Sequence, residues 1–366
     1  MHVPDGFLDV PTSLATGAIA VGGVGLALRR AEGEIRRSGP ALPGLVAAFV
    51  FATQMVNFPV GAGTSGHLLG AALAAALVGP WTAVLVMSVV LVVQALLFAD
   101  GGLTALGTNI TLMAIIAVAV GSLVTQALLR VLPKRPASVV PAATAGAFVS
   151  VPAAAGAFAL LYAVGGAVAI PLPALATAMI GWHVVIGIGE AVITAAIVGA
   201  VVATRPDLVW AARGLRQDLL LVDSEGQHTI VPVGSSGLGE RRGGAPRRGA
   251  RGLLTVGTLV TLVIAGLLSL LASSHPDGLE FVGEQLGFAG AGESSAAAGS
   301  PLADYALSGV QQAWGTSVAG VVGVLVTVAL ALTLAALAAR RRTRVATKRS
   351  DTVDAAVGAT ATGRGE

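Results

Sequence analysis

The sequence contains no cysteine, and only 11% of its 366 residues are charged and 4% aromatic. Without cysteine, disulfides and thiolate metal sites are excluded, and histidine, carboxylate, carbonyl, amine and methionine sulfur remain as metal ligands. The scarcity of charge excludes a soluble globular protein, because such proteins carry about 25% charged residues. A phosphate loop, GxxxxGK followed by Ser or Thr, is also missing, so we expect this chain to hydrolyse no ATP itself.

Two other absences weigh against two alternative interpretations. No HExxH pair occurs, although an intramembrane metalloenzyme would need such ligands and a water-activating base. A transporter of organic solutes would need aromatic side chains around its cavity, but the chain has only four Trp and two Tyr. We expect neither enzymatic activity nor a nucleic-acid partner.

Hydrophobic residues make up 55% of the chain, and its mean hydropathy is +0.84. These values predict an all-α polytopic membrane protein, in which the 49 Gly allow helices to pack closely. Nine apolar runs approach the ~20 residues that cross a bilayer. They lie at about 12–28, 41–57, 67–79, 81–98, 104–129, 138–165, 174–203, 253–272 and 317–339. The run 67–79 is short, so a re-entrant segment is the alternative to a crossing there.

The positive charges predict the orientation. All 22 Lys and Arg fall in four hydrophilic stretches, at 29–37, 130–135, 205–251 and from 340 onward. Nine crossings place all four on one side, which the positive-inside rule makes cytoplasmic. We therefore expect a multi-pass protein of the cell membrane, surrounded by lipid, with its N-terminus outside and its C-terminus in the cytoplasm. Because the first basic cluster follows the first apolar run, we expect an uncleaved helix rather than a signal peptide.

The first nine residues, MHVPDGFLD, carry a candidate metal site. The amine of Met1, the amide nitrogen of His2 and the His2 ring Nδ1 form adjoining five- and six-membered chelate rings, so three nitrogens share one plane. Coordination through a deprotonated amide favours cobalt, nickel or copper over magnesium, calcium or manganese. Pro4 and Gly6 predict a turn that folds this end back. The alternative is a frayed terminus that binds nothing.

A further candidate ligand, His67, lies in the Gly-rich outer link QMVNFPVGAGTSGHLLGAAL and can fill the fourth position of that plane. Asn57, Thr64 and Ser65 lie in the same link, and Asn109 lies in FADGGLTALGTNITLM at another outer boundary. We expect these four polar residues to hydrogen-bond the ligands and orient their rings. The alternative is that the Thr and Asn side chains only join helices to one another.

The apolar run 174–203 contains His183 and Glu190, seven residues apart on one helical face. A carboxylate inside the membrane is costly, so we expect Glu190 to have a functional or a structural partner. His183 has three candidate roles: a proton-linked partner, an alternative ligand, or a structural hydrogen bond between helices, which we favour.

The first apolar run has two faces of small residues. Ala18 lies one turn before Gly22, and Gly23 lies one turn before Ala27. Such faces let another helix approach closely, either within this chain or on a partner membrane protein.

The chain divides into modules. In the outer loop SSHPDGLEFVGEQLGF, His275, Asp277 and Glu280 can capture a cation, but a turn with a helix cap explains the same residues equally well. We predict a transmembrane metal-capture domain at 1–203, a basic cytoplasmic linker at 204–252, a two-helix module at 253–339 and a basic, disordered tail at 340–366.

Four elements, MHVPDGFLD, GTSGHLLG, FADGGLTALGTN and GIGEAVITA, together resemble the substrate-capture membrane proteins of cobalt and nickel energy-coupling factor transporters, the CbiM/NikM family. The resemblance covers residues 1–203. The element SSHPDGLE resembles the PDGLE module of the small CbiN/NikN-type partner, here carried in fusion. One departure is FPVGAGTSGH, where many relatives have a Pro-Gly-Gly turn.

This resemblance implies a seven-helix bundle with the N-terminal segment inserted from outside. It also implies a nearly square metal plane made by the amine of Met1, the amide and ring nitrogens of His2, and the ring of His67. Family members work with an energy-coupling transmembrane component and two ATPase subunits. We therefore expect capture of Co(II) or Ni(II) as cargo, without another cofactor, for ATP-driven uptake. Cobalt, for example for cobalamin synthesis, is slightly favoured, and a nickel-specific component is the alternative.

Overall fold

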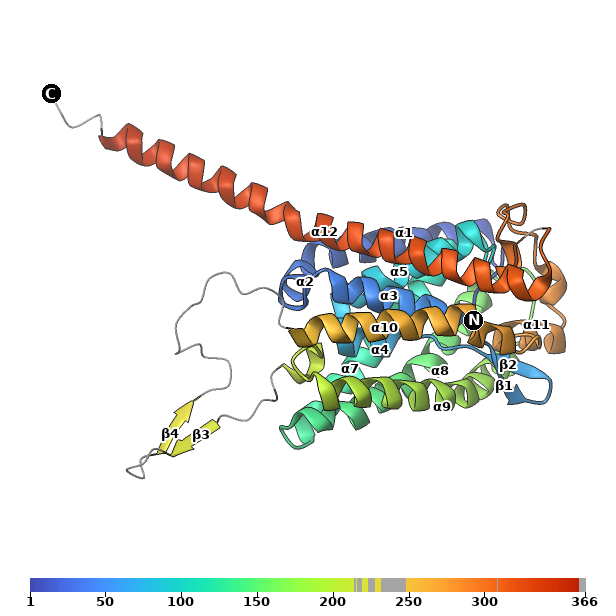
Figure 1. Ribbon diagram of the computed structural model, residues 1–366. Helices are drawn as coiled ribbons and strands as arrows, with labels where there is room; N and C mark the ends of the chain where they lie inside the picture. The colour runs from blue at the N-terminus through green and yellow to red at the C-terminus, as the bar shows by residue number, and fades with distance from the viewer. Residues whose placement is uncertain (214, 216–218, 223–227, 232–247, 308, 362–366) are drawn as a thin grey trace.

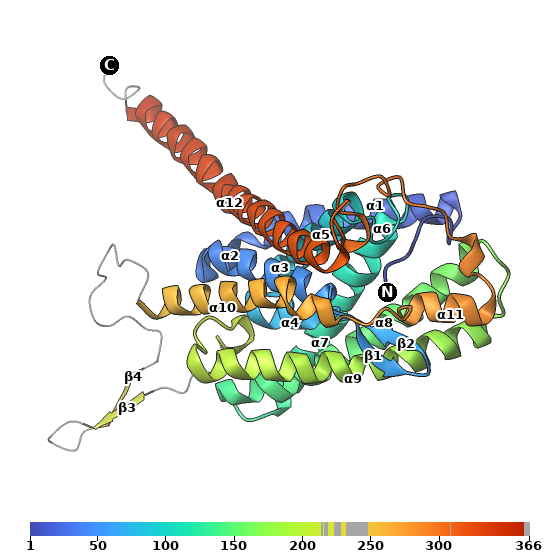
Figure 2. The same ribbon diagram turned by 45° about the vertical axis from the view of Figure 1, so that its right-hand side comes forward.

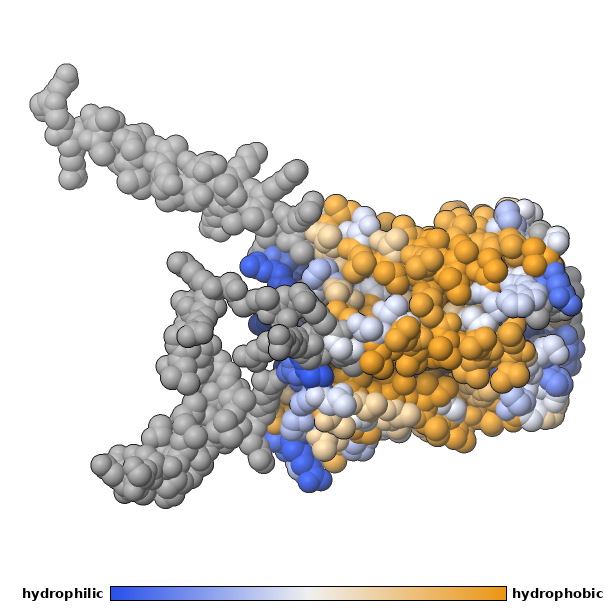
Figure 3. Space-filling model, in the orientation of Figure 1, coloured by the Kyte–Doolittle hydropathy of each residue, from blue (hydrophilic) through white to orange (hydrophobic). Residues whose placement is uncertain are grey.

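The computed structural model describes residues 1–213, 215, 219–222, 228–231, 248–307 and 309–361. Within these ranges the chain is a bundle of helices along one common axis, with two short antiparallel hairpins (Figure 1). Apolar residues cover the middle of the face shown in Figure 3, and hydrophilic residues gather at its two ends. The expectation of an all-α polytopic protein is confirmed.

Seven spans of the described residues are long and apolar enough to cross a membrane, and they match seven of the nine predicted runs. The remaining two runs are shorter helices. The helices of the seven spans are α1 (Val10–Arg30), α5 (Pro80–Leu97), the continuous α6 (Leu106–Asn109), η1 (Ile110–Ile116) and α7 (Ala117–Val131), then α8 (Val139–Gly165), α9 (Leu172–Thr204), α10 (Arg248–Gly266) and α12 (Gln312–Ala361); the shorter two are α3 (Ala41–Gln54) and α4 (Ala71–Val78).

Helix α4 is too short to cross the bundle by itself. Its eight residues rise about 12 Å, less than half of the ~30 Å hydrocarbon core. The antiparallel hairpin of β1 (Phe58–Gly61) and β2 (Thr64–Gly66) precedes α4 at one end of the bundle, and α5 begins beside α2 (Glu32–Ser38) at the other end (Figure 1). A re-entrant segment would return to its starting end. The chain here instead runs from end to end, with the non-helical residues 67–70 before α4.

Helix α2 is tied to the start of α5 by Glu34. Its carboxylate accepts hydrogen bonds from the Thr82 N–H at 2.7 Å, the Thr82 hydroxyl at 2.8 Å and the Trp81 N–H at 3.4 Å. The first N–H groups of a helix have no partner within the helix, so a carboxylate here satisfies them and is favoured by the helix dipole. Pro80 at the first helical position needs no such partner.

The second module packs against the first, since α10 and α12 both contact α3. The loop between them crosses the bundle end that holds the N-terminus (Figure 2), and its helix α11 contacts α9 and β2. The short elements of this loop are η4 (Leu268–Leu271), α11 (Gly278–Leu286), η5 (Ala289–Ala291) and η6 (Ala303–Tyr305).

The tail differs from expectation. Helix α12 continues to Ala361, so the segment from 340 that was predicted to be disordered is helical that far. Its content of Ala and Arg, both strong helix formers, accounts for the difference. About half of the linker 204–252 lies outside the described residues. Its described part contains η3 (Trp210–Ala212), the antiparallel strands β3 (Leu219–Val222) and β4 (His228–Val231), and the beginning of α10.

The two small faces of α1 have different surroundings. Ala27 is fully buried, and Gly23 lies against Ile115 of η1. Ala18 and Gly22 are exposed, and nothing among the described residues comes within 4 Å of the position of a Cβ on Gly22. The face of Gly23 and Ala27 therefore packs within the chain, and the face of Ala18 and Gly22 stays open.

We expect Glu34→Ala to lower the free energy of unfolding by about 1–3 kcal/mol, because buried N–H groups at the start of α5 lose their acceptor. Equilibrium unfolding in detergent, followed by circular dichroism, measures this change. The matched control is Glu32→Ala, because Glu32 forms only an ion pair at 3.4 Å with the exposed Arg36, which is worth about 1 kcal/mol or less. Equal effects of the two substitutions would contradict the role assigned to Glu34.

Candidate metal site at the N-terminus

The first residues lie inside the end of the bundle. Met1 is 5% and His2 8% exposed. Asn109 holds the next residue, Val3, on both sides: its Oδ1 accepts from the Val3 N–H at 2.7 Å, and its Nδ2 donates to the Val3 carbonyl at 3.0 Å. Asn109 thus fixes the backbone directly after His2, rather than a ligand ring as expected.

The turn after these residues is fixed in the same way. Gly6 has φ of +84°, which glycine adopts without strain. The carboxylate of Asp5 accepts from the N–H groups of Leu103 at 3.1 Å and Thr104 at 2.7 Å. The predicted turn is confirmed, and the alternative of a frayed terminus is wrong, because this end of the chain is buried and hydrogen-bonded.

The amine of Met1 contacts two groups. It lies 2.8 Å from Nε2 of His67 and donates to Oδ2 of Asp277 at 2.5 Å. The His67 Nδ1 lies 3.1 Å from the Leu68 carbonyl, which can only accept, so Nδ1 carries the proton and Nε2 keeps a free lone pair. Two nitrogens at right angles on one metal ion, each about 2.0 Å away, lie about 2.8 Å apart. The amine and His67 Nε2 therefore have the spacing of adjacent ligands.

The ring of His2 stacks on that of His67, with 5.1 Å between centroids and 21° between planes. Its Nε2 lies 3.2 Å from Oε1 of Gln94, and its Nδ1 lies 3.1 Å from Oδ1 of Asp100. Burial lowers the pKa of His2 below its ordinary value, although the charge of Asp100 opposes this. The neutral ring that burial favours is the form in which histidine binds metals.

Asp277 has two functions at once. Its Oδ1 accepts from the N–H groups of Leu279 at 2.8 Å and Glu280 at 2.9 Å, in a capping box that begins α11. Its Oδ2 holds the amine of Met1. Burial acts to raise the pKa of Asp277, but the positive charge of the amine and its hydrogen bond to the carboxylate outweigh burial and hold the pKa well below its ordinary value. The negative charge of Asp277 in turn raises the pKa of Glu280. The helix cap expected in PDGLE is present, and the same carboxylate holds a cationic group.

A cavity of about 270 Å³ lies beside these groups, lined by both His2 and His67. Among the described residues that line it, none is Lys or Arg. Such a surface concentrates cations by its field. Its carboxylates come from both modules and belong to Asp5, Asp100, Asp277, Glu280, Glu293 and Asp304.

The other polar residues of the His67 link do not orient the imidazoles. The Ser65 hydroxyl donates to the His275 carbonyl at 2.8 Å, and the Thr64 hydroxyl donates to the Pro276 carbonyl at 3.2 Å. Asn57 lines the cavity. Since β2 runs along the turn before α11, Thr64 and Ser65 hold the second module in place, which corrects the role expected for them.

His183 and Glu190 face the region behind the site. The Nδ1 of His183 lies 2.7 Å from the Met179 carbonyl, within its own helix rather than between helices as we favoured. Its Nε2 has no hydrogen-bond partner among the described residues, and its ring lines a cavity of about 10 Å³ beside Met1 and His67. Glu190 accepts hydrogen bonds from the backbone at the start of α4.

Two of the site's polar contacts were missed by the sequence analysis. Gln94 binds His2, and Gln54 binds Gln94. The signal that could have found them is a polar amide inside an otherwise apolar run, which is costly in a membrane unless it has a partner. The pairing of Asp100 with His2 was missed as well, because it depends on how two distant loops meet.

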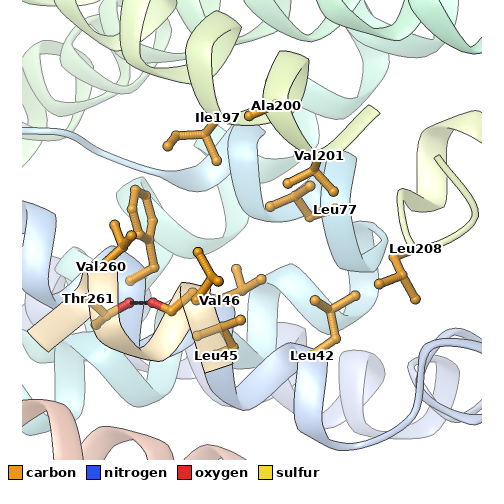
Figure 4. Close-up of a pocket in the computed structure, with 13 residues that line it drawn as sticks. Leu42, Leu45, Val46, Leu77, Ile197, Ala200, Val201, Leu208, Val260 and Thr261 are labelled. Carbon is orange, nitrogen blue, oxygen red and sulfur yellow. Dashed lines mark hydrogen bonds between the residues drawn. The ribbon is translucent and has the colours of Figure 1, made fainter. Parts of the chain in front are cut away.

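The rest of the described chain offers no competing site. Among the described residues, no group of three or more His, Cys, Asp or Glu side chains could hold a metal ion, so the candidate depends on the amine of Met1. The cavity in Figure 4, of about 190 Å³, is lined by side chains such as Leu42, Ile197 and Val260, and none of its lining side chains carries a nitrogen or a carboxylate.

An apolar helical bundle with a buried, acid-lined cavity at one end has the architecture of a membrane transport protein. Comparison with known families identifies the family of transport proteins to which the chain belongs. The chain belongs to the family described as the cobalt uptake substrate-specific transmembrane region, whose model matches residues 2–208, and residues 251–340 match the PDGLE domain. It is thus a transporter component of a cobalt and nickel transport family, not an enzyme.

The names of individual relatives agree with this family. A putative fused nickel transport protein of Archaeoglobus fulgidus is 32% identical over 91% of this chain and 98% of its own. A putative metal transport protein of Haloquadratum walsbyi is 40% identical over 57% of this chain and 94% of its own. A crystal structure described as a truncated transition metal transporter has a TM-score of 0.50 and 32% identity, and the match covers 56% of this chain and 99% of that one.

We expect Asn109→Ala to weaken Ni²⁺ binding about tenfold or more, because loss of both bonds to Val3 frees the backbone that carries His2. Competition with a metal indicator, on detergent-purified protein, measures the affinity. Asn57→Ala is the matched control, since Asn57 lines the same cavity without a hydrogen bond to the N-terminal segment, and it should stay within about threefold of the parent. An Asn109→Ala protein with unchanged affinity would refute this positioning role.

Proposed function

We propose that this chain captures Co(II) or Ni(II) at the outer face of the cell membrane, as the substrate-specific component of an energy-coupling factor transporter. The observation that carries the proposal is the convergence of the Met1 amine, Nε2 of His67 and the His2 ring beside an acid-lined cavity. ATP hydrolysis on partner subunits then drives delivery inward. The ion is cargo, and no further cofactor is needed.

The proposed ligands are Met1, His2 and His67. The amine and amide nitrogens are bonded within one residue, so their spacing follows from covalent geometry. His67 already lies at the distance of an adjacent ligand from the amine. Four nitrogens in a plane suit low-spin Ni(II) and accept Co(II), whereas oxygen-preferring ions such as magnesium and calcium would be poor occupants.

The arguments on cobalt and nickel point in different directions. The sequence slightly favoured cobalt. The planar nitrogen set suits nickel better, and relatives that carry the name fused nickel transport protein occur in Archaeoglobus fulgidus and Rhodobacter capsulatus. We therefore propose nickel as the ion bound more tightly.

Charge supports the orientation proposed here. The acid-lined cavity lies at the end of the bundle that holds the N-terminus. The basic residues of the first cluster lie at the end of α1 and on α2, at the opposite end of the bundle, which would face the cytoplasm. A cation arriving from outside would meet the carboxylates first and the nitrogen ligands next.

The second module is proposed to load the site. Asp277 holds the Met1 amine, and Asp100 lies against Nδ1 of His2, so two carboxylates hold two of the proposed ligand atoms. A divalent ion attracted to these carboxylates would arrive beside the nitrogens that bind it. Domains 1–203 and 253–339 would thus act together, with one capturing the ion and the other supplying Asp277 through the PDGLE loop.

The energy-coupling transmembrane component is proposed to contact α1. Ala18 and Gly22 leave an exposed face of small residues on this helix, which would allow the close approach of a partner helix. The two ATPase subunits would bind that component from the cytoplasm.

We expect two residues added before Met1 to abolish Ni²⁺ and Co²⁺ retention while leaving membrane insertion intact. The extension turns the amine into an amide and pushes the chain into a buried space. Metal content of the purified protein, measured by mass spectrometry, tests this. The matched control carries the same two residues after Glu366. Metal retention by the N-terminally extended protein would exclude the amine as a ligand.

We also expect Asp277→Asn to slow Ni²⁺ association severalfold, because Asn still caps α11 but removes the charge next to the amine. Stopped-flow mixing with a metal indicator measures the rate. Glu284→Gln removes one exposed charge from the same helix, away from the cavity lining, and should leave the rate nearly unchanged. If both variants bind as fast as the parent, Asp277 does not load the site.

A further inference from the structure

A chain of buried hydrogen bonds leads away from His2 into the bundle. Nε2 of His2 lies 3.2 Å from Oε1 of Gln94, and Nε2 of Gln94 donates to Oε1 of Gln54 at 2.8 Å. Nε2 of Gln54 then donates to the Leu69 carbonyl at 2.8 Å. Gln54 and Gln94 are 3% and 0% exposed, so water does not replace these contacts. Three helical segments and the N-terminus are therefore linked by one polar path.

The direction of this path is set by its inner end. The Leu69 carbonyl can only accept, so the amide nitrogen of Gln54 must face it and the oxygen of Gln54 must face Gln94. By the same reasoning the oxygen of Gln94 faces His2. The contact with Gln94 therefore requires a proton on Nε2 of His2, whereas the 3.1 Å contact of Nδ1 with Oδ1 of Asp100 would require one on Nδ1, so a neutral ring can donate to only one of the two. With the proton on Nε2, the lone pair of the neutral ring lies on Nδ1. This is the nitrogen that the chelate with the amine requires.

The path ends on the segment that carries the other imidazole. Leu69 follows His67 by two residues, and the path therefore joins both rings by a second route besides the amine. At the same place, the carboxylate of Glu190 accepts from the Leu69 N–H at 2.6 Å and the Gly70 N–H at 2.8 Å. These N–H groups begin α4 and have no other helical partner. Glu190 thus holds the short helix from α9 while Gln54 holds it from α3.

We propose that Gln94 and Gln54 are positioning residues that hold His2 against the start of α4, and that metal binding through His2 and His67 tightens the contact of α4 with Glu190. This inference rests on the proposed function, since it takes both imidazoles as ligands. It assigns a coupling role to α4, the one short helix inside the bundle that follows directly on a ligand. Occupancy of the site would be transmitted to the middle of the membrane by this path.

The test uses the full chain in nanodiscs with Ni²⁺ as the probe. Hydrogen exchange of residues 66–79 is measured with and without Ni²⁺, together with Ni²⁺ affinity and the visible absorption of the bound ion. We expect Ni²⁺ to slow exchange at the start of α4 in the parent. Gln54→Leu, which removes no hydrogen bond to a proposed ligand, should weaken affinity about tenfold to a hundredfold and remove the Ni²⁺-dependent slowing. The matched control is Gln126→Leu, in a separate cavity beside Arg37 and Arg130, which should behave as the parent.

Several outcomes would overturn the inference. Parent-like affinity and Ni²⁺-dependent protection in Gln54→Leu would do so. If that variant does not fold, Gln54→Met keeps a side chain of similar length but cannot donate to the Leu69 carbonyl, and parent-like behaviour there counts equally against the path. Absence of Ni²⁺-dependent slowing in the parent overturns it without any variant. His67→Ala separates the two proposals. If His67→Ala leaves Ni²⁺ affinity unchanged, the proposed function fails. If His67→Ala loses Ni²⁺ binding while the Gln54 variants behave as the parent, only the coupling path is refuted.

Discussion

A charged amine buried in the end of a helical bundle is the constraint on which this structure depends. Removing an ammonium group from water costs several kcal/mol unless it is paired and hydrogen-bonded. Here the amine of Met1 has two partners, the lone pair on Nε2 of His67 and the carboxylate of Asp277. These partners come from the segment before α4 and from the second module. Satisfying one group therefore brings three distant parts of the chain to one place.

The short helix α4 follows from the same requirement. A full-length helix there would place its hydrogen-bonded backbone where His67 must meet the amine. The chain instead is non-helical over 67–70, and its freed backbone groups are bonded by Gln54 and Glu190. Irregular backbone within a membrane protein is tolerated where protein groups replace the missing bonds. The costly polar side chains inside the bundle are thus explained by the position of one histidine.

The two modules share the polar cavity. Asp100 belongs to the first and Asp277, Glu280, Glu293 and Asp304 to the second, so neither module forms the acidic lining alone. The fusion keeps them together in one chain, and the contacts of Ser65 with the His275 and Pro276 carbonyls fix the PDGLE turn beside the amine. A carboxylate that caps a helix has little freedom, which makes Asp277 a well-positioned partner for a cationic group.

The sequence by itself indicated the membrane class, the apolar runs that include the seven long spans, and Met1 and His2 as a candidate chelate. Apolar runs and charge asymmetry are local properties, and adjacent nitrogens are spaced by covalent bonds. It also indicated His67, because this histidine lies on the same predicted side of the membrane as His2 and can fill the fourth position of the plane. Only the tertiary structure decided that Asp277 pairs with the amine and that Gln54 and Gln94 lead to α4, since these contacts join residues 15 to 276 positions apart. Such pairings depend on how helices pack, which no local pattern encodes.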